Sequence, residues 1–212
     1  TDMAGNNRVM GDGIDVGAYE YINEVAPTVR LTFDGTTETA IIYFRTSDGN
    51  FKMTVGDDTY TVRDVQPNVD KGVALPLGGA TSASIYADGL LRLRIEEQGL
   101  IAIDLSNASA LTMIKLAGNK LTALDVTGNP QLTGIYAEKN AIAAIDLSKN
   151  ASLRVLQMFD NRLSGTLDLS GMNMLSSVDI DNNSVSELLL PSHSRLVEVN
   201  CENNMLTAID IA

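Results

Sequence analysis

The chain has 212 residues, 44% of them hydrophobic, which is enough to bury a core in one or two domains. Acidic residues outnumber basic ones by 27 to 15, a net charge of −12. This balance argues against nucleic acid and anionic membrane surfaces, which select clustered Lys and Arg, and the apolar runs are too short for membrane insertion. With one Cys and one His, an internal disulfide is excluded, and we expect neither a metal site nor a cofactor.

The first 24 residues differ from everything that follows. Residues 4–8 (AGNNR) and 14–21 (IDVGAYEY) resemble the closing segment of right-handed parallel β-helix surface proteins. The resemblance implies that residues 1–24 are a tail or linker, the remnant of an upstream domain. A second interpretation is a Gly-rich tail that adds an edge strand to the next domain.

Residues 25–88 have the pattern of a small antiparallel β-sandwich. Polar and apolar residues alternate over short stretches separated by turn signals such as Gly56-Asp57-Asp58. These stretches are residues 28–33, 41–44, 51–55, 60–65 and 84–86. The run FKMTVGDDTY resembles a degenerate form of the W-G-D-G-T turn of polycystic-kidney-disease-type sandwich domains. That resemblance implies an N-terminal cap over the apolar end of the segment that follows.

A repeat governs residues 89–212. Six units start at residues 90, 111, 132, 153, 175 and 196, in steps of 21, 21, 21, 22 and 21. The apolar fourth and sixth places alternate with other residues, as in a strand with one buried face. Stacked units should therefore align their strands into a parallel sheet. The predicted fold is mainly β, an antiparallel sandwich followed by a short solenoid.

The ninth place of each unit is Asn in all units but the first, which has Gln98. A side-chain amide can satisfy backbone groups of a turn. Repeated in register, these residues should form a ladder through the interior: Asn119, Asn140, Asn161, Asn183 and Asn204.

The second half of most units reads like Leu124-Asp125-Val126-Thr127. The apolar pair should face inward and the Asp outward, which predicts a second short extended segment on the back of each coil. The extra residue of the fourth unit, near Gly165-Thr166, predicts a local bulge.

The signature L-x-x-L-x-L-x-x-N-x-L, matched six times in succession, resembles the leucine-rich repeat family. In similar bacterial surface proteins a small sandwich directly precedes such repeats. The resemblance implies a non-enzymatic binding module with an extracellular or cell-surface location.

The outward face of the repeat sheet is the candidate binding surface. Its side chains come from the third, fifth and seventh places, and they are basic in the first strand, aromatic and apolar in the middle, and acidic in the last two. Exposed aromatic residues clustered on a sheet are typical interface anchors. We expect an unknown protein or glycan to bind over these residues: Met113, Tyr136, Val155, Gln157, Phe159, Asp179 and Asp181.

Two other functions stay open: a structural spacer whose activity lies in an absent upstream β-helix, and a carbohydrate-active enzyme that uses Asp179, Asp181 and Glu198. His193 lies in a turn beside two serines, where a solvated side chain is a better interpretation than a catalytic one. No catalytic residue is predicted.

An uncovered last coil would also predict self-association through the C-terminal end of the solenoid.

Overall fold

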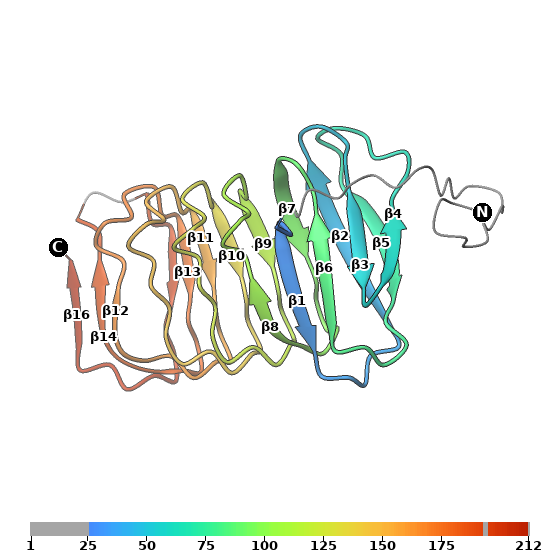
Figure 1. Ribbon diagram of the computed structural model, residues 1–212. Helices are drawn as coiled ribbons and strands as arrows, with labels where there is room; N and C mark the ends of the chain where they lie inside the picture. The colour runs from blue at the N-terminus through green and yellow to red at the C-terminus, as the bar shows by residue number, and fades with distance from the viewer. Residues whose placement is uncertain (1–25, 193–194, 212) are drawn as a thin grey trace, which may run out of the picture.

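The computed structural model describes residues 26–192 and 195–211, and every helix or strand assigned among them is a β-strand. The strands form one long stack, with the N-terminal strands at one end and the last coil at the other (Figure 1). This confirms the predicted fold class, an antiparallel sandwich followed by a solenoid with a parallel sheet. The predicted tail, residues 1–24, and His193 lie outside the described residues.

Six strands build the N-terminal sandwich, and they pair antiparallel with one another. β3 and β4 form a hairpin in which Val55 pairs with Asp58, and Gly56 in its turn has a positive φ that glycine adopts without strain. Inward residues alternate with outward ones along β1 and β2, as the sequence pattern requires. The six strands are β1 (Val29–Phe33), β2 (Thr39–Thr46), β3 (Lys52–Val55), β4 (Asp58–Thr61), β5 (Lys71–Pro76) and β6 (Ser82–Tyr86).

The alternation pattern missed β5, because its sequence KGVALP contains a Gly and a Pro. Both residues are acceptable here because β5 is an edge strand, paired on one side with β2. Gly72 also has a packing role. A Cβ at this position would lie 2.6 Å from Cε1 of Tyr43, so the glycine lets the Tyr43 ring lie against β5.

Six parallel strands, one from each repeat unit, continue the same sheet as β2 and β5. The sheet order is β15-β13-β11-β10-β9-β7-β2-β5, so each repeat strand pairs with those of the adjacent units. The strands are β7 (Leu90–Arg94), β9 (Met113–Lys115), β10 (Gly134–Tyr136), β11 (Val155–Gln157), β13 (Ser177–Asp179) and β15 (Glu198–Asn200).

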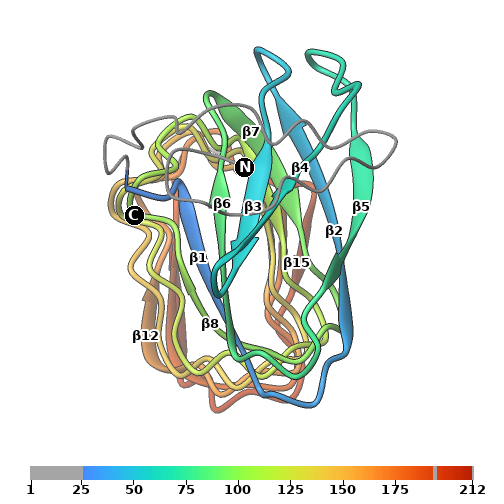
Figure 2. The ribbon, with the colours of Figure 1, turned by 45° about the vertical axis from the view of Figure 1, so that its right-hand side comes forward.

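The sandwich joins the solenoid through both of its sheets. β2 pairs antiparallel with β7, and on the opposite side β1 pairs antiparallel with β8 (Leu100–Asp104). Figure 2 shows β2 and β15 on one side of the molecule and β1, β8 and β12 on the other. The sandwich strands therefore meet the first coil with both backbone hydrogen bonds and apolar side chains.

The back of the coils carries a shorter parallel sheet, formed by β12 (Ser164–Asp168), β14 (Ser184–Leu190) and β16 (Ala208–Ile211). Its register shifts between Gly165 and Thr166, where the sequence places the extra residue. The expected extended segments at residues 124–127 and 145–148 are not strands. Their apolar side chains still point inward, because burial of the alternate residues needs no regular backbone ladder: Leu124, Val126 and Leu147 are buried.

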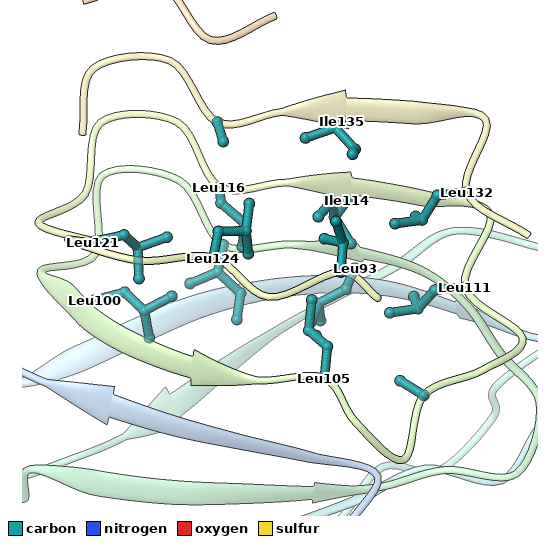
Figure 3. Packing of buried hydrophobic residues seen from close by; sticks show 14 of the residues in the cluster. Leu93, Leu100, Leu105, Leu111, Ile114, Leu116, Leu121, Leu124, Leu132 and Ile135 are labelled. Atoms are coloured by element: carbon teal, nitrogen blue, oxygen red, sulfur yellow. The ribbon is translucent and has the colours of Figure 1, made fainter. Parts of the chain in front are cut away.

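The interior is one continuous apolar core. Leucines and isoleucines from the sheet side and the back side of successive coils meet in it, as Leu93, Leu105 and Ile114 do in Figure 3. A single coil could not enclose such side chains alone, so the stacking of coils is what buries them.

The ninth-place asparagines make the same hydrogen bonds in successive coils. The side-chain nitrogen of Asn140 donates to Leu116 O and Ala137 O, at 3.0 and 3.1 Å, and its side-chain oxygen accepts Leu121 N–H at 3.0 Å. Asn161, Asn183 and Asn204 repeat this pattern one coil further each time. Asn119 accepts two N–H groups, those of Gln98 and Leu100. These bonds satisfy turn groups that no strand partner reaches.

A second column of asparagines lies on the back of the coils and was not predicted. Asn129 and Asn150 are fully buried, and each donates to carbonyls of the preceding coil. Asn129 donates to Leu105 O at 3.1 Å and to Ala108 O at 2.9 Å. Two polar columns therefore tie adjacent coils together, one after the strand and one at the back turn.

The eighth place of every unit has a positive φ. One of the six residues is a glycine, Gly118, and the other five carry side chains. These are Glu97, Lys139, Asp160, Asn182 and Asn203, with φ values from 51° to 57°. This left-handed residue turns the chain inward, immediately before the ninth-place Asn.

Candidate binding face

The register of the eight-stranded sheet aligns outward side chains into rows that cross the strands. The first row begins beside Asp70 and contains Arg45, Arg92, Met113, Gly134, Val155, Ser177 and Glu198. The second row contains Gly72, Tyr43, Arg94, Lys115, Tyr136, Gln157, Asp179 and Asn200. We call the surface formed by these two rows, together with Phe159 and Asp181 just beyond the strands, the repeat face.

A pocket of about 280 Å³ lies on the repeat face where β2, β7 and β9 meet. Its outward lining comes from Tyr43, Asp70, Arg92, Arg94, Met113 and Lys115. We call it the basic pocket, because three of these side chains are cationic in a chain of strongly negative net charge. Its volume is at the lower limit for small-molecule sites, so it suits one functional group of a larger partner.

Two tyrosines flank the cations of the second row. Arg94 lies 5.0 Å from the ring centroid of Tyr43, and the Lys115 ammonium lies 4.7 Å from that of Tyr136. The attraction between a cation and an aromatic face holds both side chains along the sheet. Gly134 makes room for the second ring, since a Cβ there would lie 3.0 Å from Cε2 of Tyr136.

Asp70 organises the outer edge of the basic pocket. It accepts two hydrogen bonds from Arg45, at 2.8 and 3.0 Å, and lies 3.8 Å from Arg92. The hydrogen bonds from Arg45, and then the positive charges of Arg45, Arg92 and Lys115, lower the pKa of Asp70. Arg94 forms an ion pair with Glu96. Among the described residues, Lys115 has no carboxylate within ion-pair distance.

The middle of the repeat face is aromatic and apolar. Met113, Tyr136, Val155, Gln157 and Phe159 are all partly buried. A second pocket, of about 370 Å³, lies beside Phe159 and is lined in part by Glu96 and Glu138. Burial raises the pKa of Glu138, and the negative charge of Glu96 adds to the rise. The Lys139 ammonium lies 5.9 Å from the ring centroid of Phe159.

The far end of the repeat face is acidic. Burial raises the pKa of Asp179, and the charges of Asp181 and Glu198 add to the rise. Asp179 Oδ1 accepts the backbone N–H of Asp181 in its own coil, at 3.3 Å. Asp181 Oδ1 instead accepts the backbone N–H of Glu202 in the next coil, at 2.7 Å. Asp181 therefore also links the last two coils, a role that its place in the repeat did not indicate.

The structure places the seven predicted site residues on one surface. Five of them, Met113, Tyr136, Val155, Gln157 and Asp179, lie in the strand register from β9 to β13. Phe159 and Asp181 each lie two residues beyond the end of their strands, β11 and β13. The sequence analysis missed Tyr43, Arg45 and Asp70, which the sandwich adds to the same face. The sequence held one signal of this surface: β2 of the sandwich and β7 of the first repeat unit both carry outward aromatic or basic residues. The sequence alone does not show that these two strands pair.

No protein-family model matches this chain. No curated protein matches it either. Among solved structures, the chain is similar to the LRR ectodomain of the receptor kinase SOBIR1 from Arabidopsis thaliana, with a TM-score of 0.51 and 22% sequence identity. The match covers 60% of this chain and 76% of that one. At this identity the likeness shows the fold, which is that of a leucine-rich repeat solenoid.

Residues 26–192 and 195–211 contain no helix of the length and apolar character needed to cross a bilayer. Within the same ranges, no cluster of three or more His, Cys, Asp or Glu side chains is arranged to hold a metal ion.

Proposed function

We propose that this chain is a non-enzymatic protein-binding module that holds its partner on the repeat face. The observation that carries the proposal is the register, which brings Tyr43, Tyr136 and the cations between them into one row of a rigid sheet. Tyr and Arg are the residues most often found as binding anchors, and anchors on strands are held more firmly than anchors on loops.

A protein partner fits this face better than a glycan. The pockets of about 280 and 370 Å³ are small and shallow, and they match single side chains of a partner. The mixture of cationic, aromatic and acidic zones also matches the mixed chemistry of a protein surface. Binding to a glycan is the alternative outcome of the experiment below.

The resemblance of the repeats to those of bacterial surface proteins supports a secreted or surface location. The solved structure with the similar fold is itself the ectodomain of a receptor kinase. We propose the same side of the membrane for this chain, as part of a surface or secreted bacterial protein.

The test is selection of binders from a displayed peptide library and a glycan array, followed by measurement with a variant of the face. Tyr136→Ala combined with Phe159→Ala should lower the affinity of selected peptides at least about tenfold and lower the melting temperature by only a few degrees, since both side chains keep part of their surface exposed.

The matched control replaces two exposed apolar residues on strands outside the eight-stranded sheet, Ile101→Ala on β8 and Ile209→Ala on β16, which are 38% and 54% exposed. This control should bind like the original chain. Equal affinity of the face variant and the original chain would remove the repeat face as the binding surface.

A further inference from the structure

The charges on the repeat face are separated along its rows. Arg45, Arg92, Arg94 and Lys115 lie on β2, β7 and β9, at the end next to the sandwich. Asp179 and Glu198 lie on β13 and β15, at the other end. Between them, β10 and β11 contribute Tyr136, Val155 and Gln157, which carry no charge at neutral pH.

At the basic end, the cations exceed their local partners. Asp70 and Glu96 pair with the arginines, which leaves Lys115 without an ion pair among the described residues and Arg92 with a single distant one, at 3.8 Å. The tyrosine rings hold Arg94 and Lys115 in place. A carboxylate that entered the basic pocket would therefore meet oriented donors, in competition with Asp70 and Glu96 for the arginines and with the charge of Glu138 for Lys115.

At the acidic end, the carboxylates repel one another. Asp179 is half-buried beside Asp181 and Glu198, and that repulsion contributes to its raised pKa. A cationic group placed over β13 and β15 would relieve the repulsion. A uniformly anionic ligand, such as an acidic glycan, would instead be repelled from this end.

We propose, on the basis of the proposed function, that the repeat face binds an extended protein segment with separated charges. Its acidic end lies in the basic pocket, its apolar middle crosses β10 and β11, and its basic end lies over β13 and β15. Five strand steps of about 4.8 Å separate β7 from β15, or about 24 Å, which an extended segment of about seven residues spans.

The probe is a synthetic peptide of about nine residues with glutamates at one end, lysines at the other and apolar residues between, made in both chain directions. A peptide of the same composition with alternating charges is the control. At low ionic strength, fluorescence anisotropy should show at least about tenfold tighter binding of the peptide with separated charges. Photo-crosslinkers on its glutamate end should label β2, β7 or β9, and those on its lysine end should label β13 or β15.

Charge reversal tests each end of the face. Arg92→Glu with Lys115→Glu should weaken binding of the separated-charge peptide at least about tenfold, and Arg92→Gln with Lys115→Gln should weaken it less. Arg63→Glu with Lys149→Glu changes the net charge equally at exposed residues away from the face and should have little effect. Asp179→Asn should weaken binding of the lysine end without lowering stability, because it removes a charge that the fold disfavours.

Two outcomes would overturn this inference in different ways. Equal binding of both peptides, with crosslinks on the face, would reject charge separation and leave the proposed function intact. Crosslinks elsewhere, or an affinity that is unchanged in the variant Tyr136→Ala with Phe159→Ala, would reject the repeat face as the binding surface. Failure of the separated-charge peptide to bind in either chain direction at about millimolar concentration would also reject the inference, whereas the library selection tests the proposed function independently.

Discussion

The strands of the sandwich are four to eight residues long and pair antiparallel, whereas five of the six repeat strands are three residues long and pair in parallel. Long antiparallel strands satisfy most of their backbone groups through one another. Short parallel strands leave the turns between them to find other partners, and here buried and partly buried asparagines fill that role. The two regions share a sheet, but the solenoid depends on buried polar side chains and the sandwich depends on its backbone ladders.

The largest expected effect tests that difference directly. Asn119 accepts N–H groups of Gln98 and Leu100 and donates to carbonyls of two coils. Asn119→Ala leaves several buried groups unsatisfied, so it should lower the free energy of unfolding by about 3 kcal/mol or more. In the sandwich, buried Thr46 accepts one backbone N–H, from Gly49, and Thr46→Val should cost only about 1 kcal/mol.

Urea denaturation of both variants measures these changes. Asn173→Ala, at an exposed position of the fourth unit, is the control for loss of an asparagine as such and should change stability by less than about 0.5 kcal/mol. If Thr46→Val proved as costly as Asn119→Ala, the distinction between the two regions would fail.

A smaller effect is expected at the left-handed eighth place of the repeats. Gly118 has φ +66°, and a Cβ there would lie 2.7 Å from Cγ of Glu97. Gly118→Ala should therefore destabilise the chain by about 1–2 kcal/mol. Gly171 has open space where a Cβ would lie and no positive φ, so Gly171→Ala should be neutral or slightly stabilising. Thermal melts of the two variants side by side check the prediction, and equal melting temperatures would contradict it.

The junction between the two regions should respond to acid. Asp34 follows β1, and its carboxylate accepts hydrogen bonds from Lys120 of the second unit and from Thr36. The bond from Lys120, more than those from Thr36, lowers the pKa of Asp34 to about 2. A carboxyl whose pKa is lower in the folded state stabilises the fold above its ordinary pKa of 3.8, and this contribution is lost as the pH falls towards 2.

Asp34→Asn should therefore lower the melting temperature at pH 5, and the difference from the original chain should shrink between pH 4 and pH 2. Comparing the two chains at each pH cancels the acid response of the other aspartates, several of which also have lowered pKa values. A difference that stayed constant over this range would show that the Lys120 contact does not depend on the charge of Asp34.

The repeat region was predictable because one spacing determines it. The apolar fourth and sixth places alternate with outward residues, and six repetitions place each strand within its unit, as β9 (Met113–Lys115) and β10 (Gly134–Tyr136) illustrate. The same spacing located the bulge at Gly165. The second asparagine column was missed because Asn129 and Asn150 lie among turn residues, where asparagine is common at the surface.

The pairing between the two regions could not be predicted in the same way. Tyr43 faces Arg94, about fifty residues further along the chain, and no periodicity relates their positions. Such pairing is decided by the packing of whole sheets, which a single sequence does not reveal. The basic pocket depends on this contact, so the sequence alone showed only its repeat-side half: Arg92, Arg94, Met113 and Lys115.

The smallest effect concerns the two ends of the solenoid. β1 and β2 cover the first coil, whereas the last described coil exposes Val197, Met205 and Ile209, at 91%, 67% and 54%. We predict weak self-association of the purified chain through this end, because two such surfaces would bury each other's apolar atoms. The area is small, so the dissociation constant should be about 0.1–1 mM. Sedimentation velocity should show an average sedimentation coefficient that rises with protein concentration.

A charge at this end should prevent the association, and the same charge elsewhere should not. Val197→Glu with Met205→Glu places carboxylates on the exposed end, and Val69→Glu with Ile101→Glu adds the same charge at exposed apolar positions away from it. If both double variants dispersed the oligomer equally, general repulsion in a chain of net charge −12 would explain the result. Dispersal by the first variant alone would show that the association runs through the apolar residues of the last described coil, whereas β1 and β2 cover the first coil.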